Sequence, residues 1–238
     1  MILLFRGGWV VVMIGMVIPL IVEEITKFFY RKFTLGGFYH LGGASGIEIN
    51  PLQALKWYAR AASSGDIASI NNIGVMLMKG LGMAQDEVAA IKWLEYAADQ
   101  GNVYSMVNLG ILLTKPTDMK CQDFNRAYEL YYKAAKMGNT IAQNNLGCML
   151  ARGYGCEKDD KKAMKYFKRS SEGGSAAAKY NVGVLHQNGW GVKADFEKAK
   201  DWFDAAASDP KHDEYPYVIA DNDPTKFLLL TSIISYKP

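Results

Sequence analysis

One alanine-led pattern recurs five times along this 238-residue chain, and it restricts the fold more than any other feature of the sequence. Each copy has two large residues three and four positions after the alanine, then two small residues seven and eight positions after it. The copies begin 36, 37, 36 and 36 residues apart, at Ala54, Ala90, Ala127, Ala163 and Ala199. A second block recurs in phase, with an asparagine two residues before a glycine, at Asn72, Asn108, Asn145 and Asn181. Such a period is typical of a solenoid, in which each unit packs only against its neighbours.

Each repeat unit predicts two helices. In the first copy the apolar residues follow the i, i+3, i+4, i+7, i+8 spacing of one helical face, at Ala54, Trp57, Tyr58, Ala61 and Ala62. Gly65 then stands where a helix can end in the left-handed conformation. The second helix contains the asparagine block, whose glycine costs a helix about 1 kcal/mol relative to alanine. Its recurrence therefore predicts close approach of neighbouring helices.

The large aromatic and the buried polar residues of the units are expected to be structural. We expect Trp57, Trp93 and Trp202 to occupy the core rather than to stack on nucleobases. The four recurring asparagines are expected to satisfy backbone groups between helices, because buried polar groups need partners. A ladder of ligand-binding amides is the less favoured interpretation.

A short turn with G-x-G completes the pattern, in the sequences GLGM, GYGC and GWGV that begin at Gly80, Gly153 and Gly189. The three blocks together resemble the Sel1-like repeat (SLR), a slightly longer relative of the tetratricopeptide repeat. The resemblance covers residues 51–208 as about four and a half units. It implies an all-α fold, namely a right-handed superhelical solenoid of antiparallel helix pairs. The second unit departs from the family pattern, because LTKPTDMKCQDF stands where G-x-G is expected.

The beginning of the chain has a different character. Residues 2–22 read ILLFRGGWVVVMIGMVIPLIV, with Arg6 as the only charge. As a helix this segment would span about 31 Å, which matches one hydrocarbon core. Glu23 and Glu24 follow, without the small residues of a signal-peptidase site. We therefore expect a transmembrane signal anchor within residues 1–25 that contacts the lipid bilayer through residues 2–22. A cleaved signal peptide and a buried terminal helix are the alternatives.

The remaining segments outside the repeats predict a linker and a tail. Residues 26–50 are expected to form the linker, and residues 209–238 an acidic segment followed by a helix that caps the solenoid. Lys27, Arg31 and Lys32 follow the apolar segment, whereas one arginine precedes it. The positive-inside rule then favours a single-pass membrane protein, of the inner membrane if bacterial, with its repeats in the cytoplasm. The chain has three cysteines, which agrees with a reducing compartment.

The sequence offers little catalytic chemistry. A net charge of +3 is too small to predict nucleic-acid binding. The histidines lie far apart in the sequence, without cysteines or carboxylates at metal-ligand spacing, so we expect no metal and no cofactor. One S-x-x-K motif runs from Ser208 to Lys211, but Pro210 interrupts the helix that such a motif requires. We expect no enzyme activity, and a cell-wall amide or β-lactam hydrolase is the disfavoured alternative.

A surface is the remaining candidate for function. The positions two, six and nine residues after the first alanine share one helical face beside the buried stripe. In the first four units these positions hold seven basic and three acidic residues. The predicted partner-binding residues are Lys56, Arg60, Lys92, Tyr96, Lys133, Lys136, Lys165 and Arg169. An ordinary solvated helix face is the alternative interpretation.

The resemblance assigns this face a role. First helices of SLR and tetratricopeptide relatives line a concave groove that receives partner segments, and a basic groove would favour an acidic peptide or a carboxyl terminus. The resemblance therefore implies a membrane-anchored scaffold or adaptor that binds another protein. An immunity protein that neutralises a secreted effector is the alternative within the same family. The sequence leaves the oligomeric state open.

Overall fold

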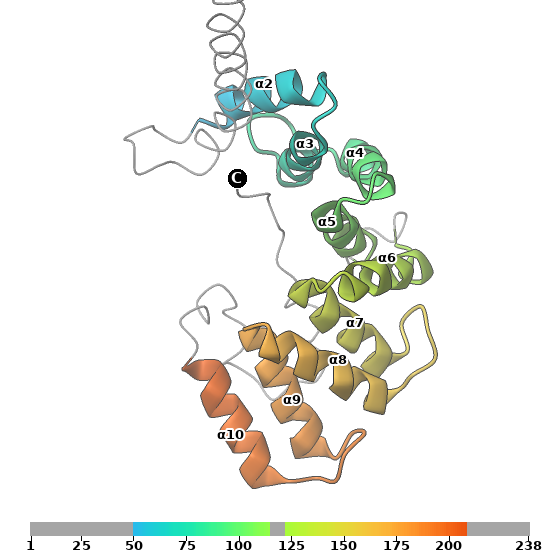
Figure 1. Ribbon diagram of the computed structural model, residues 1–238, viewed down its shortest axis with the longest axis vertical. Coiled ribbons are helices and arrows are strands. Elements are labelled where there is room, and N and C mark those ends of the chain that lie inside the picture. The colour runs from blue at the N-terminus through green and yellow to red at the C-terminus, as the bar shows by residue number, and fades with distance from the viewer. Residues whose placement is uncertain (1–49, 115–121, 209–238) are drawn as a thin grey trace, which may run out of the picture.

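The computed structural model describes residues 50–114 and 122–208, and within these ranges all regular structure is helical. The helices are α2 (Pro51–Ala62), α3 (Ile67–Lys79), α4 (Glu87–Asp99), α5 (Val103–Thr114), α6 (Phe124–Lys136), α7 (Thr140–Arg152), α8 (Asp160–Glu172), α9 (Ala176–Asn188) and α10 (Phe196–Ala207). Each helix packs against the next one in the chain, and the helices follow one another along a curved path (Figure 1). The predicted all-α solenoid of helix pairs is confirmed.

The predicted anchor, linker and capping helix fall on residues 1–49 and 209–238, which lie outside the described residues. Among the helices that the structure describes, none is both long enough and apolar enough to cross a lipid bilayer.

Recurring residues set the ends of the helices. An asparagine or aspartate precedes each of α2, α4, α6, α8 and α10, and its side chain accepts a backbone N–H from the first helical turn. Four of these five helices are closed by a glycine with φ between 84° and 87°, at Gly65, Gly101, Gly138 and Gly174. Glycine adopts this left-handed conformation without the strain of a Cβ, so the predicted helix ends are confirmed.

The two kinds of helix differ sharply in burial. The helices α3, α5, α7 and α9 each bury nine or ten residues. The helices α2, α4, α6, α8 and α10 bury between two and five. Each member of the first set lies between two helices of the second set, and α3 also packs against α5. The second set therefore supplies most of the exposed helix surface.

The glycine inside each buried helix allows a large side chain of the next helix to approach its backbone. A Cβ on Gly110 of α5 would lie 2.6 Å from Cε1 of Tyr131 on α6. A Cβ on Gly147 of α7 would lie 2.6 Å from Cε1 of Phe167 on α8. The predicted close packing is confirmed, and its partner is the following helix.

None of the three tryptophans is fully buried, and the prediction that they occupy the core is wrong for Trp57 and Trp93, whereas Trp202 packs against the core while remaining partly exposed. Trp93 is 39% exposed, and Trp57 and Trp202 are partly exposed. The next residue is the buried one, as for Tyr58, which is 3% exposed, and Leu94, which is fully buried. Adjacent residues on a helix point about 100° apart, so only one of two neighbouring large side chains can point at the glycine.

The G-x-G turns after α3, α7 and α9 each pack against the helix before the one they follow. The second glycine of each turn packs against the first peptide group of that earlier helix. After α3, for example, this glycine is Gly82, and a Cβ on it would lie 2.8 Å from the carbonyl carbon of Pro51 at the start of α2. Gly155 makes the same contact with Phe124, and Tyr154 stacks on the Phe124 ring with centroids 4.7 Å apart. A side chain at the second glycine would separate the turn from that helix.

Candidate interaction surface

All eight predicted partner-binding residues are exposed on α2, α4, α6 and α8. Among the described residues, none of the seven basic members forms an ion pair. Other exposed lysines are engaged: Lys162 pairs with Asp159 at 3.1 Å, and Lys198 pairs with Asp195 at 3.0 Å. The predicted residues, called the basic row below, therefore keep their charges available to a partner.

Two members of the basic row lie over aromatic rings. The Arg60 guanidinium is 5.5 Å from the centroid of the Trp57 ring, and the Lys136 ammonium is 4.6 Å from that of Tyr132. Cation–π contacts of this kind restrict a long side chain while leaving its charge exposed. Sequence analysis missed Tyr132, which is 37% exposed. Its position directly after the buried Tyr131 is the signal that could have placed it on the surface.

The structure brings the basic row together within helices rather than between them. Lys92 and Tyr96 are four residues apart on α4, and Lys133 and Lys136 are three apart on α6, so each pair shares a helical face. The members on α2 and α8 are likewise four residues apart. Among the described residues, no ion pair or cation–π contact joins members on different helices.

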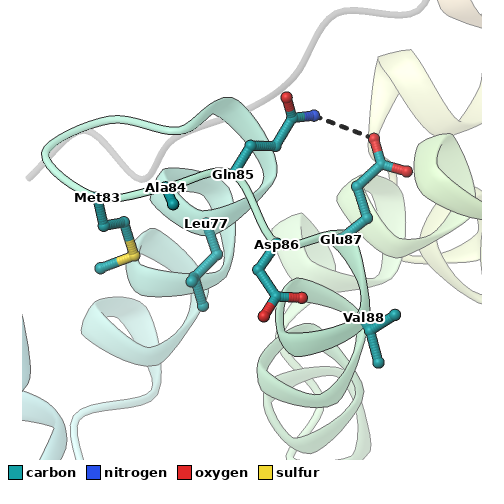
Figure 2. Close-up of a pocket in the computed structure, with 7 residues that line it drawn as sticks. All are labelled: Leu77, Met83, Ala84, Gln85, Asp86, Glu87 and Val88. Atoms are coloured by element: carbon teal, nitrogen blue, oxygen red, sulfur yellow. Dashed lines mark hydrogen bonds between the residues drawn. The ribbon is translucent and has the colours of Figure 1, made fainter.

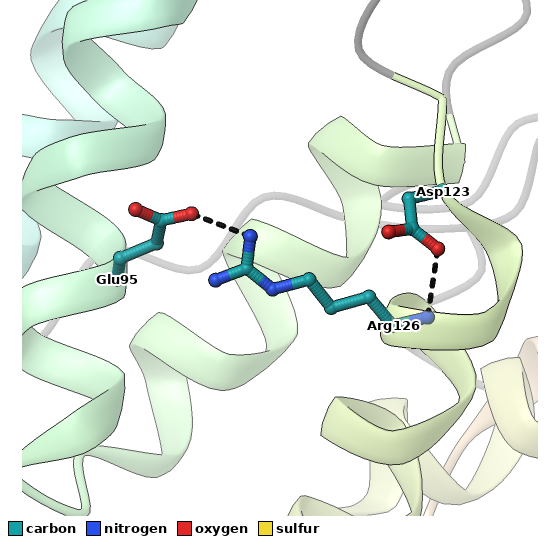
Figure 3. A network of polar contacts seen from close by, with 3 residues as sticks. All are labelled: Glu95, Asp123 and Arg126. Carbon is teal, nitrogen blue, oxygen red and sulfur yellow. Dashed lines mark hydrogen bonds and ion pairs between the residues drawn. The ribbon is translucent and has the colours of Figure 1, made fainter.

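An ion pair beside the basic row joins α4 to α6. The Arg126 guanidinium lies 2.6 Å from a carboxylate oxygen of Glu95 (Figure 3). The backbone N–H of Arg126 also donates to the capping carboxylate of Asp123 at 3.0 Å. The side chains of Arg126 and Glu95 are 45% and 30% exposed, so the pair contributes only about 0–1 kcal/mol.

A shallow hollow of about 700 Å³ lies at the start of α4 (Figure 2). Its lining consists of Leu77, Met83, Ala84, Gln85, Asp86, Glu87 and Val88. The Asp86 carboxylate caps α4 by accepting the Ala89 N–H at 2.8 Å, and Glu87 accepts from Gln85 Nε2 at 3.2 Å. The polar groups of the hollow thus have local structural partners, and its lining holds no nucleophile or histidine.

Outside this hollow, the side chains that could take part in catalysis or metal binding are buried or dispersed along the chain. Burial raises the pKa of the Cys148 thiol to about 12, which keeps it protonated. Burial also lowers the pKa of His186. Ser208 caps the end of α10, where its hydroxyl donates to the Ala205 carbonyl at 3.4 Å. Lys211 of the S-x-x-K motif and Cys121 lie outside the described residues. Within the described ranges, no three His, Cys, Asp or Glu residues gather as metal ligands.

Comparison with known proteins shows which family and which solved structures this architecture resembles. The family model of the Sel1 repeat matches residues 34–66, 67–102, 103–139, 140–175 and 176–209. A Sel1 repeat protein from Oxalobacter formigenes is 27% identical over 85% of each chain, with a TM-score of 0.68. The protein c5321, a protective antigen of uropathogenic Escherichia coli with an SLR fold, is 26% identical over 86% of this chain, with a TM-score of 0.67. The chain spans 45% of the length of that protein. No curated protein matches the chain.

The matched units are offset by one helix from the units used in the sequence analysis. Residues 67–102, for example, contain α3 followed by α4. From this unit onward, the first helix of a matched unit is one of the more buried helices (α3, α5, α7 or α9). On α4, α6 and α8 the basic row therefore lies on the second helix of the matched unit, and the last matched unit, which contains α10, holds no member of the row. Its placement along a concave groove stays a prediction.

Proposed function

The chain belongs to the Sel1 repeat family, whose members generally mediate protein–protein interaction, and we propose that it is a membrane-anchored scaffold that binds an acidic protein segment through the basic row. The observation that carries the proposal is the exposure of seven cationic side chains without ion-pair partners among the described residues. The proposed function includes no catalytic activity.

Charge complementarity selects the partner. Unpaired cations at matching positions of α2, α4, α6 and α8 attract carboxylates on a partner, either acidic side chains or a carboxyl terminus. The exposed rings of Tyr96 and Tyr132 add apolar contact area beside these charges. Because exposed charges are screened by salt, such binding should weaken as ionic strength rises.

The apolar segment of residues 2–22 supports the membrane part of the proposal. It would hold the repeats close to a bilayer, and Lys27, Arg31 and Lys32 favour a cytoplasmic location for them. A reporter fused to the C-terminus and active on one side of the membrane tests this orientation. Activity on the external side would contradict it.

The binding proposal is tested with a fluorescent peptide of eight glutamates as the probe, in fluorescence anisotropy with the full chain in detergent micelles. The variant Lys92→Glu/Lys165→Glu should weaken binding at least tenfold. The control Lys161→Glu/Lys193→Glu makes the same change in net charge at two exposed lysines outside the basic row. Equal losses in both variants, or no binding by the original chain, would remove the basic row as the site.

A further inference from the structure

Two of the four recurring asparagines, Asn108 and Asn181, join buried helices of neighbouring units through side-chain amides. Nδ2 of Asn108 on α5 donates to Oδ1 of Asn71 on α3 at 3.1 Å. Nδ2 of Asn181 on α9 donates to Oδ1 of Asn144 on α7 at 2.9 Å. All four side chains are at most 2% exposed. For Asn108 and Asn181, the expectation that the recurring asparagines satisfy backbone groups is corrected, because each donates to a side chain in the preceding unit.

The equivalent link is missing between α5 and α7. The asparagine of α7 that corresponds to Asn108 and Asn181 is Asn145, which is 1% exposed. The acceptor position in the preceding unit, three residues before Gly110, is held by the fully buried Val107. Within residues 50–114 and 122–208, Nδ2 of Asn145 has no hydrogen-bond partner. Burial raises the pKa of the nearby Tyr131 hydroxyl and Asn145 only partly opposes that rise, and among the described residues this hydroxyl has no hydrogen-bond partner either.

The segment after α5 also lacks the turn glycine that makes a second recurring contact in the other units. The turns after α3, α7 and α9 use Gly82, Gly155 and Gly191 to pack against the first peptide group of an earlier helix. The sequence after α5 has no G-x-G, so this unit has no counterpart glycine for that contact.

We propose that the junction between α5 and α7 is the hinge of the solenoid, with an asparagine pair locking the junctions on either side of it. Apolar packing is continuous across the junction, but it is non-directional and tolerates small rotations. A hydrogen bond between buried amides has a narrow range of distances and angles, so it holds α3 to α5 and α7 to α9 in one arrangement. Val107 leaves the middle junction without that constraint.

Bending at this junction changes the spacing of the basic row. Lys56 and Lys92 lie on one side of the hinge, and Lys165 lies on the other. The solenoid can therefore vary the distance between these charges without breaking either asparagine pair. The hinge itself does not depend on the identity of the partner.

The experiment compares two matched pairs of spin labels by pulsed electron–electron double resonance, on the full chain in detergent micelles. The pair Lys92→Cys/Lys165→Cys spans the α5–α7 junction, and the pair Lys56→Cys/Glu129→Cys spans the α3–α5 junction at equivalent positions. The three native cysteines are first replaced as Cys121→Ser, Cys148→Ala and Cys156→Ser. We expect a distance distribution about twofold broader for the first pair than for the second.

Substitutions at the acceptor position then test the cause. Val107→Asn should narrow the first distribution to the width of the second, because it supplies an acceptor for Asn145. Asn71→Val should broaden the second distribution, and it remains informative if Val107→Asn does not fold. Equal widths for the two pairs in the original chain would overturn the hinge. Widths that do not respond to either substitution would overturn the role of the asparagine pairs.

Discussion

The Phe167 ring of α8 lies directly against the backbone at Gly147 of α7, so that a Cβ at Gly147 would come within 2.6 Å of Cε1 and 2.8 Å of Cδ1. Every other described unit repeats this contact with a different large side chain. The recurring glycine is therefore required by the packing of the next helix, not by the conformation of its own helix.

Gly147→Ala should destabilise the protein even though alanine is the better helix former. The methyl group overpacks the interface and should cost about 1–3 kcal/mol in the free energy of unfolding, measured by urea denaturation. Phe167→Leu in the same chain should recover part of the loss, because the smaller side chain can move away. A stabilised Gly147→Ala variant would contradict the contact.

Asp159 should make stability depend on pH in the acid range. Its pKa is lowered from 3.8 by the hydrogen bond from the Lys162 backbone N–H and by the Lys162 side chain. The stabilisation is therefore present above pH 3.8 and is lost as the pH falls through the lower folded-state pKa. Asp159→Asn keeps a capping side chain but does not titrate. Thermal unfolding from pH 6 to pH 2.5 should show a smaller loss in this variant.

His186 should contribute a second pH dependence nearer neutrality. Burial lowers its pKa below 6.5, Lys168 and Lys198 lower it further, and Asp195 opposes them. The folded state disfavours the charged imidazole, so stability should fall as the pH drops from 6.5 through the folded-state pKa. His186→Gln removes this group. The difference in unfolding free energy between pH 7.5 and pH 5.5 should be smaller in the variant, and an unchanged difference would exclude His186 as its source.

Cys148 should resist thiol reagents while the protein is folded. It is fully buried, and its raised pKa of about 12 leaves almost no thiolate at pH 8. In a Cys121→Ser/Cys156→Ser background, Ellman's reagent should react with the single remaining thiol at least a hundredfold more slowly in buffer than in 8 M urea. Equal rates would show that α7 opens readily.

The sequence predicted the elements of this fold better than their contacts. Helix number and helix ends followed from the period and from residues such as Gly65, whose conformation is a local property. The choice between Trp93 and Leu94 as the core residue failed, because adjacent large side chains give the same periodic signal. The link from Asn108 to Asn71 was not foreseen, since it depends on how one unit stacks on another.

For the candidate surface too, local features could be predicted from the sequence and contacts between helices could not. Exposure of Lys92 and the other members of the basic row follows from helical spacing and holds in the structure. Their lack of ion pairs within the described part of the chain and the ring beneath Lys136 depend on rotamers and neighbouring helices, which the residue spacing does not determine. The identity of a partner depends on a second molecule and lies beyond both kinds of reasoning.

The unequal burial of the two sets of helices has an evolutionary consequence. Most residues of α3, α5, α7 and α9 are buried, whereas most residues of α2, α4, α6, α8 and α10 are exposed or partly exposed. Substitutions can therefore accumulate on one set of helices while the other preserves the stacking. A lineage carrying this architecture can diversify its recognition specificity rapidly without first gaining stability, because selection for binding and selection for folding act on separate residues.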